Sequence, residues 1–380
     1  MASLYLHIPF CEKKCLYCDF YSIENSSIIE DFLTALREEI RLSSSRGRGT
    51  RFGTVYFGGG TPSLLSPRQL GDVLGALRES FSIVEDAEVT VEVNPGTVSP
   101  DKLRAYRALG FNRLSIGVQS FDAAELRFLE RIHDRAEAIR CVEDARAAGF
   151  VNLSLDLIYA LPGQSPGRWH ANLEEALRLR PDHISAYSLI VEDGTPLARL
   201  VARGEVTPAP VEDEARMYEI TMETLESHGF EHYEISNYAR PGFRSRHNSS
   251  YWSHDDYLGF GPSAHSFWMD KGARSGRRWS NIAHLQTYCA RLALHVLPVC
   301  FEETVAAREL LNERIFLGLR SDGVNLPALR MEYGIDLRES RRDIVDGLLD
   351  ERCASLEGGL LRLTPKGFLL CDEIAGRMMV

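Results

Sequence analysis

In its first half the chain alternates between short apolar runs and longer stretches whose apolar residues recur at helical spacing. The short runs are rich in β-branched and aromatic residues, as buried strands are, and the longer stretches are typical of amphipathic helices. This alternation predicts a parallel sheet whose strands are joined by helical crossovers. The predicted strands are 4–8, 54–57, 88–93, 113–118, 152–158 and 183–190, and the predicted helices are 28–42, 67–80, 99–109, 122–148 and 167–179.

The alternation ends near residue 191, and the remaining chain divides into two further parts. The first part holds a predicted helix, a strand, a Gly- and aromatic-rich stretch without clear periodicity and a second helix, which are 211–228, 231–235, 238–268 and 281–294. The second part resembles a small winged-helix module, with predicted helices at 305–319, 326–333 and 344–351, a strand at 360–363 and a last helix. We therefore expect three domains, which are 1–200, 201–300 and 301–380.

Three cysteines, Cys11, Cys15 and Cys18, follow the first predicted strand in the spacing CxxxCxxC. Three thiolates this close in sequence can close around one metal centre. A structural zinc site usually takes four protein ligands, and an ordinary ferredoxin cluster takes four cysteines. Three cysteines instead indicate a [4Fe–4S] cluster with one iron open to a small molecule. The spacing alone also allows a zinc site completed by His7 or by a distant cysteine.

Composition narrows the remaining possibilities. The formal net charge of −11 argues against non-specific nucleic-acid binding, and acidic residues outnumber basic ones in the C-terminal module. No apolar run approaches the roughly 18 residues of a membrane-spanning helix, and the first ten residues lack the basic region of a secretion signal. The other five cysteines are scattered, which favours a reducing cytoplasm. Peripheral membrane association and oligomeric state stay open.

Several predicted strands end in residues suited to ligand binding. In a parallel sheet wound with helices, the carboxyl ends of the strands form the active site. Glycines allow the backbone to approach a ligand closely, and polar side chains can hold it. In chain order these residues are Gly59, Gly60, Thr61, Glu92, Gln119, Arg131 and Asp156, with Arg131 on the predicted helix 122–148.

The cysteine spacing, preceded by Tyr-x-His-Ile-Pro-Phe, resembles the defining motif of the radical S-adenosylmethionine (SAM) superfamily. The stretch 259–266 and the C-terminal module extend the resemblance, over nearly the whole chain, to its HemN/HemW branch. It implies an α/β fold: a partial (β/α)6 TIM-type barrel in 1–200, an α+β extension in 201–300 and a winged-helix-like module in 301–380. It implies a [4Fe–4S] cluster on Cys11, Cys15 and Cys18. The SAM-binding residues that it implies are Tyr5, Tyr17, Gly59, Gly60, Thr61, Glu92, Gln119, Arg131 and Asp156.

Two types of protein within this branch are distinguished by short motifs. Oxygen-independent coproporphyrinogen III oxidases carry CxxxCxxCxC and a longer start, whereas here Phe20 stands at the fourth cysteine position and ten residues precede Cys11. The sequence His-Asn-x-x-Tyr-Trp at 247–252 resembles that of HemW-type haem chaperones. That resemblance implies haem as a third cofactor, His247 as its iron ligand, and client haem proteins as partners. The oxidase and a zinc-stabilised interaction module without a cluster are the alternatives.

Overall fold

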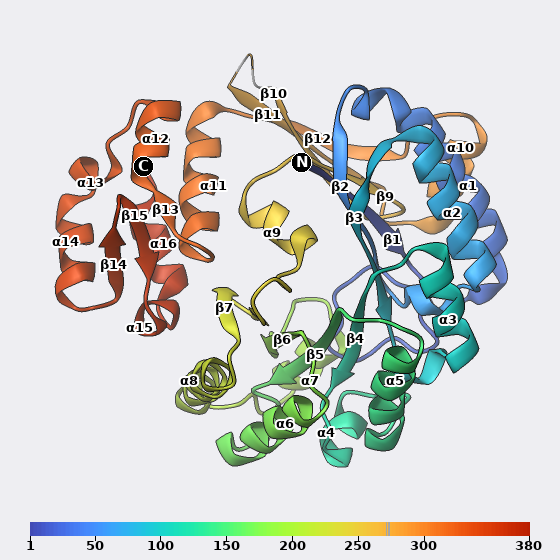
Figure 1. Cartoon of the computed structure of the whole chain (residues 1–380), viewed down its shortest axis with the longest axis horizontal. Coiled ribbons are helices and arrows are strands. Elements are labelled where there is room, and N and C mark those ends of the chain that lie inside the picture. The colour runs from blue at the N-terminus through green and yellow to red at the C-terminus, as the bar shows by residue number, and fades with distance from the viewer. Residues whose placement is uncertain (271, 273) are drawn as a thin grey trace.

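The computed structural model describes residues 1–270, 272 and 274–380. Its centre is a parallel sheet in which the first six strands lie side by side in chain order (Figure 1). Their apolar side chains, such as those of Leu4, Leu6 and Ile8, are fully buried, which is why these runs form interior strands. All six predicted strands are confirmed. They are β1 (Ala2–Ile8), β2 (Arg51–Gly59), β3 (Ser82–Val93), β4 (Arg113–Gln119), β5 (Leu153–Tyr159) and β6 (His183–Ser188).

Helices connect these strands on the outer side of the sheet, as Figure 1 shows. Their starts follow local capping: Ser66 and Gln69 form a capping box at the first residues of α2, and Ser99 caps α3. Gly110, in the left-handed region, ends α3. The helices are α1 (Ile29–Ser43), α2 (Pro67–Ser80), α3 (Pro100–Leu109), α4 (Ala123–Phe128), α5 (Arg135–Ala147) and α6 (Pro166–Arg178).

The predicted helical stretch 122–148 is not continuous, because the chain breaks it into α4 and α5. Glu130 has φ 55, a left-handed conformation that a helix cannot contain, and a capping box of Asp134 and Glu137 restarts the helix. Arg131 therefore lies in the connection between the two helices and not on a helical face. This break matters for the site described below.

Strands from the second part of the chain extend the same sheet at both edges, giving the order β12-β11-β10-β9-β1-β2-β3-β4-β5-β6-β8-β7. At one edge β9 pairs with β1 in parallel, and at the other β8 pairs with β6. The stretch 238–268 is thus more regular than expected. The added elements are α7 (Pro196–Ala202), α8 (Val211–Ser227), β7 (Glu231–Glu234), β8 (Asn237–Ala239), α9 (Arg246–Trp252), β9 (Tyr257–Phe260), β10 (His265–Asp270), β11 (Ser275–Asn281), α10 (Leu285–Ala293) and β12 (Val299–Val305).

The C-terminal module stands beside the barrel, with α9 between them in Figure 1. Its three-stranded sheet has the order β13-β15-β14. Several contacts attach it to the part of the chain in 201–300. Among them, Ile235 N donates to Arg320 O at 2.9 Å, and Arg244 pairs with Asp322 at 2.9 Å. The division into three domains stays a prediction. The module contains α11 (Ala307–Leu319), β13 (Val324–Asn325), α12 (Leu326–Tyr333), α13 (Leu337–Ser340), α14 (Arg342–Asp350), β14 (Ala354–Glu357), β15 (Leu360–Leu363), α15 (Pro365–Phe368) and α16 (Cys371–Met378).

A single buried carboxylate joins the edge strands to the barrel helices. Glu39 of α1 accepts hydrogen bonds from Gly261 N at 2.8 Å, Asn281 Nδ2 at 2.6 Å and Tyr288 Oη at 2.6 Å. Burial raises its pKa to about 7. Within the part of the chain that the structure describes, no helix is long and apolar enough to cross a membrane.

Candidate cofactor site at the mouth of the barrel

A cavity of about 500 Å³ opens at the carboxyl ends of the parallel strands. Its lining comes from all six strands or the connections that follow them, as expected for this type of sheet. Most of the predicted site residues meet here although they are up to 145 positions apart in the chain, from Cys11 to Asp156. Those that line the cavity are Cys11, Cys15, Tyr17, Cys18, Gly59, Gly60, Thr61, Glu92, Gln119, Arg131 and Asp156.

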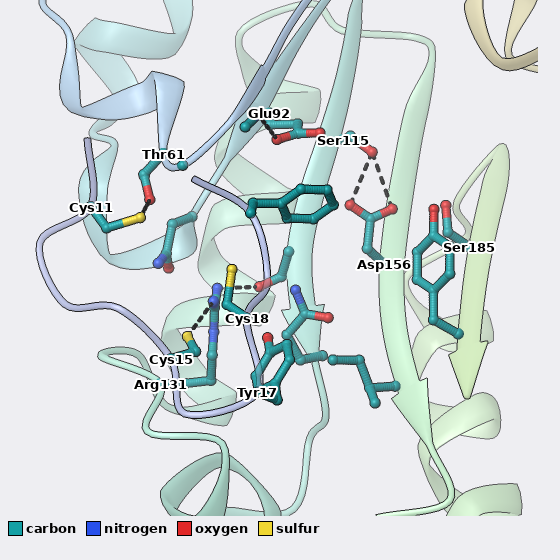
Figure 2. Close-up of a pocket in the computed structure, with 18 of the residues that line it drawn as sticks. Cys11, Cys15, Tyr17, Cys18, Thr61, Glu92, Ser115, Arg131, Asp156 and Ser185 are labelled. Carbon is teal, nitrogen blue, oxygen red and sulfur yellow. Dashed lines mark hydrogen bonds between the residues drawn. The ribbon is translucent and has the colours of Figure 1, made fainter. Parts of the chain in front are cut away.

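The three cysteines lie together on the loop after β1, at one side of this cavity (Figure 2). None forms a disulfide. Two hydrogen bonds point at them: Thr61 Oγ1 donates to Cys11 Sγ at 3.7 Å, and Arg131 Nη1 donates to Cys15 Sγ at 3.6 Å. Burial raises the pKa of Cys18 to about 11, so its thiolate form needs a compensating positive centre. Three soft ligands with nearby donors fit an iron–sulfur cluster.

The zinc alternative needs a fourth ligand beside the three cysteines. His7, the nearby candidate for a fourth ligand, has both ring nitrogens in hydrogen bonds. Its Nε2 donates to Tyr21 O at 2.7 Å, and its Nδ1 lies 3.1 Å from Tyr5 Oη.

The GGT connection after β2 packs directly against the cysteine loop. Gly60 N donates to Ile8 O at 2.8 Å, and Thr61 N donates to Phe10 O at 2.7 Å. Gly59 has φ +110, and a Cβ there would lie 2.6 Å from the His7 ring. A Cβ on Gly60 would lie 2.7 Å from Phe10 O. Both glycines are therefore required for the loop to approach this closely.

Two carboxylates face the cavity opposite the cysteines, as Figure 2 shows. Glu92 accepts hydrogen bonds from Tyr56 Oη at 2.9 Å and from Gly59 N at 3.2 Å. Asp156 accepts from Ser115 Oγ at 3.0 Å. Burial raises the pKa of Glu92 to about 7 and also raises the pKa of Asp156. Both would bind a cationic, hydrogen-bond-donating ligand more strongly than an anionic one.

Arg131 offers a free donor on the cysteine side. The break after α4 brings its guanidinium to Gly117, whose carbonyl oxygen accepts from Nη2 at 2.9 Å. Its Nε is buried and has no hydrogen-bond partner among the described residues. Gln119, at φ 65, lies next to it; a Cβ on Gly117 would be 2.9 Å from Gln119 Nε2 and 3.4 Å from Arg131 Nη2. An unpaired donor and two carboxylates together complement a ligand with both ammonium and carboxylate groups.

The sequence predictions did not name several polar side chains that line the same cavity. The signal was present in the strands, because inward-facing residues alternate along them: Arg113, Ser115, Gly117 and Gln119 share one face of β4 and all line the cavity. The further lining residues are Tyr56, Arg113, Ser115, Ser185 and Tyr187.

Tyr5 and His247 lie outside this lining. Tyr5 is packed behind it, with its ring 6.2 Å from that of Tyr56. His247 is 2% exposed, and both its ring nitrogens are engaged: Nδ1 lies 2.8 Å from Thr54 Oγ1, and Nε2 lies 3.0 Å from Tyr251 Oη. Burial, with the nearby Arg113 charge, lowers its pKa to about 3. In this conformation His247 does not offer a nitrogen to haem iron.

Two family models match the chain, the Radical SAM superfamily over residues 5–176 and the HemN C-terminal domain over 305–370. The chain is 36% identical to a protein of Bacillus subtilis named heme chaperone HemW, covering 100% of this chain and 99% of that protein. It is 38% identical to a Mycobacterium tuberculosis protein of the same name, over 99% and 94%. A mitochondrial radical S-adenosyl methionine domain-containing protein 1 from Bos taurus is 37% identical, over 84% and 73%.

Among solved structures, the coproporphyrinogen III oxidase HemN from Escherichia coli matches with a TM-score of 0.84 over 100% of this chain and 90% of that one. At 24% sequence identity this match shows the fold alone. The superfamily implies a [4Fe–4S] cluster and SAM, and the thiols, carboxylates and unpaired Arg131 donor of the cavity fit both. The full-length identity to the chaperones shows that the chain belongs to the HemW family of the radical SAM superfamily.

Proposed function

We propose that this protein is a haem chaperone that holds a [4Fe–4S] cluster and SAM in the barrel cavity, binds haem and passes it to client haem proteins in the cytoplasm. The observation that carries the proposal is its similarity over the full length to proteins named heme chaperone HemW. The location rests on the scattered, unpaired cysteines, which suit a reducing compartment.

In this proposal the cysteine side of the cavity holds the cluster, and the charged side chains of the cavity bind SAM. Cys11, Cys15 and Cys18 would hold the cluster, which would leave one iron open to the amino and carboxylate groups of SAM. The unpaired Arg131 Nε supports a role in pairing the SAM carboxylate. Glu92 and Asp156 accept hydrogen bonds from SAM, Asp156 from the ribose hydroxyls. When reduced, a cluster of this type can cleave SAM and supply a carbon radical.

The open side of the cavity suits a flat apolar ligand. Phe20 is 66% exposed and Ile190 is 64% exposed, and both line the cavity rim together with the exposed side chains of Ile132 and Tyr187. Exposed apolar side chains gathered around a cavity usually mark a binding surface. We propose that this rim, which we define as Phe20, Ile132, Tyr187 and Ile190, covers one face of haem.

The iron ligand is a separate part of the proposal. His247 is the candidate from the His-Asn-x-x-Tyr-Trp motif, but its ring would first have to leave Thr54 and Tyr251. Its neighbour Asn248 lines the cavity. Haem ligation by His247 thus requires a rearrangement of the start of α9, and haem binding would be slower than simple docking at the rim.

Phe20 also bears on the oxidase alternative. It occupies the position at which the oxidases carry a fourth cysteine, and its ring is exposed at the rim. An oxidase must convert coproporphyrinogen III and release product, whereas a chaperone must retain haem until a client takes it. Incubation with coproporphyrinogen III distinguishes the two, because an oxidase converts it and a chaperone leaves it unchanged.

The test is a haem titration of the anaerobically reconstituted protein with and without SAM, followed by incubation with coproporphyrinogen III under reducing conditions. We expect one haem per chain, a Soret band altered in His247→Ala, and no vinyl-group formation. Phe20→Ala should weaken haem binding. The matched control is Phe301→Ala, which removes an exposed ring from β12 at the far edge of the sheet. Vinyl-group formation, or the absence of haem binding, would overturn the proposal.

A further inference from the structure

Arg113 is a buried cation at the inner end of the cofactor cavity. It begins β4, six residues or roughly 20 Å before the strand ends at the mouth. Its side chain is 1% exposed and nevertheless lines the cavity. Its Nε has no hydrogen-bond partner among the described residues. A guanidinium buried this deeply is costly unless opposite charges face it.

Three carboxylates lie on the two strands that flank β4. Glu88 and Glu92 lie on β3, where Thr90 pairs with Arg113, and Asp156 lies on β5 beside Gly117. The Arg113 charge acts on each of them: Glu88 and Asp156 stabilise the cation, and the cation lowers the pKa of Glu92 and Asp156 against the opposing effect of burial. The other titratable groups that face Arg113 are Tyr56, His183, Tyr233 and His247.

The carboxylates differ in what else they hold. Glu88 accepts hydrogen bonds from Arg246 N and His247 N, each at 3.0 Å, at the start of α9. Glu92 and Asp156 face the cavity, where Tyr56, Gly59 and Ser115 donate to them. The charge of Arg113 therefore acts on two kinds of carboxylate. Glu88 bonds the backbone at the start of α9, whereas Glu92 and Asp156 face the cavity.

We propose that Arg113 is a positioning residue for SAM, whose charge favours the ionised forms of Asp156 and Glu92 that face the cavity. This inference rests on the proposed SAM-binding function and deepens it. Two carboxylates sharing one desolvated site hold a proton between them unless a cation is close. Arg131 and Lys13 also line the cavity, but they lie at the cysteine side, against Cys15 and Glu130. The inner end therefore depends on Arg113.

A purely structural role for Arg113, as the partner of Glu88 alone, gives a different expectation. In that case a substitution would lower stability and weaken SAM binding equally at every pH. If Arg113 positions the carboxylates, its loss shifts the pH range in which SAM binds, because Asp156 and Glu92 then take up protons at higher pH. The shift is the readout that separates the two roles.

The experiment measures SAM affinity by calorimetry from pH 6 to 8 in the anaerobically reconstituted full chain, with iron content and thermal unfolding as parallel readouts. In Arg113→Met we expect a full complement of iron, SAM affinity about tenfold weaker at pH 7, and the pH midpoint of binding raised by about one unit. Arg113→Lys keeps the charge and should restore most of the midpoint. An unchanged midpoint in Arg113→Met overturns the inference.

A second variant keeps the test decisive if Arg113→Met does not fold. Arg113→Gln combined with Glu88→Gln removes a buried pair of opposite charges together, which leaves no uncompensated charge from that pair. The midpoint should still rise in this double variant, because Asp156 and Glu92 lose their cation; an unshifted midpoint again overturns the inference. A wild-type protein that binds no SAM at any pH would instead refute the SAM part of the proposed function, and this inference with it.

Discussion

The CxxxCxxC motif lies at the cofactor cavity, and the His-Asn-x-x-Tyr-Trp motif lies at α9. The side chains of the two regions differ in whether their polar groups already have partners. In the cavity, polar side chains face open space, and Arg131 Nε lacks a partner among the described residues. At α9, His247 is sealed between Thr54 and Tyr251 and stacks on Tyr56 at 4.8 Å. The cavity therefore leaves polar groups available to a ligand, whereas the polar groups of His247 are already hydrogen-bonded within the protein.

This difference indicates that a motif residue such as His247 can contribute by packing against residues of the cofactor site, without contacting a ligand itself. Tyr56 links the two regions, because its ring packs on His247 while its hydroxyl donates to Glu92. Trp252, at the other end of α9, lines a separate cavity of about 220 Å³ together with Arg314 and Asn325 of the C-terminal module. The predictions below test whether substitutions in the cavity change cofactor binding while a substitution in α9 changes stability.

The largest effect is expected at the cysteine loop. Cys15→Ala should lower the iron content from about four atoms per chain to near zero, because two cysteines cannot hold the cluster. The matched control is Cys300→Ala, an exposed free cysteine on β12, which should leave iron content unchanged. Iron and acid-labile sulfide analysis after reconstitution measures this. A full cluster in Cys15→Ala would remove the ligand assignment.

The second largest effect is on stability at α9. His247→Ala should lower the free energy of unfolding by about 2–4 kcal/mol, because it leaves a cavity and unpaired hydroxyls at Thr54 and Tyr251. His170→Ala, in α6 with 51% of its side chain exposed, is the control and should change little. Denaturant unfolding of the two variants provides the measurement, and equal stability would contradict the packing role of His247.

The pH dependence of the same stability has a definite sign. The pKa of His247 is lowered from 6.5 to about 3, so the unfolded chain binds the proton first. This residue therefore contributes a loss of wild-type stability as the pH falls from about 6.5 towards 3. The loss should be smaller in His247→Ala than in the wild-type protein.

SAM binding should show a somewhat smaller effect. Asp156→Ala removes a carboxylate that would accept hydrogen bonds from the ligand, and it should weaken SAM binding by about 1–3 kcal/mol while the cluster survives. Asp101→Ala, on the surface at the start of α3, is the matched control. Calorimetry measures both. Unchanged affinity in Asp156→Ala and also in Arg131→Ala would place the SAM site elsewhere.

The smallest predicted effect concerns the protonation of Glu92, whose pKa is raised to about 7 by burial. The ammonium group of SAM favours the ionised carboxylate, so SAM affinity should fall roughly tenfold as the pH drops from 7.5 to 6. Glu92→Gln should bind more weakly at pH 7.5 and lose most of this dependence. An identical pH profile in the variant would show that another group controls binding.

Local sequence patterns predicted the parallel strands and most helices because each was encoded by its own residues. Helix α2 begins at Pro67 as predicted, since Ser66 and Gln69 cap it. The cavity residues that could be predicted lie in the cysteine motif or at the carboxyl ends of predicted strands. The pairing of β9 with β1, about 250 positions apart, could not be predicted, because it depends on long-range contacts.

Three features that the sequence did not reveal have specific physical causes. Arg131 was placed on a helix because nothing in its local pattern shows that Glu130 adopts a left-handed conformation. Arg113 was passed over as a strand residue, because a charged side chain facing inward is recognised only once Glu88, Glu92 and Asp156 are seen around it. Burial of His247 likewise depends on Thr54 and Tyr56 from a distant strand.

The most direct test of the central claim is haem transfer. The reconstituted protein is loaded with one haem per chain and mixed anaerobically with an apo-haem protein whose Soret band differs, with SAM present and coproporphyrinogen III in a parallel sample. We predict that haem moves to the acceptor while the cluster iron stays bound and coproporphyrinogen III stays unchanged. Haem that is never bound or never released, or decarboxylation of coproporphyrinogen III, would contradict the account.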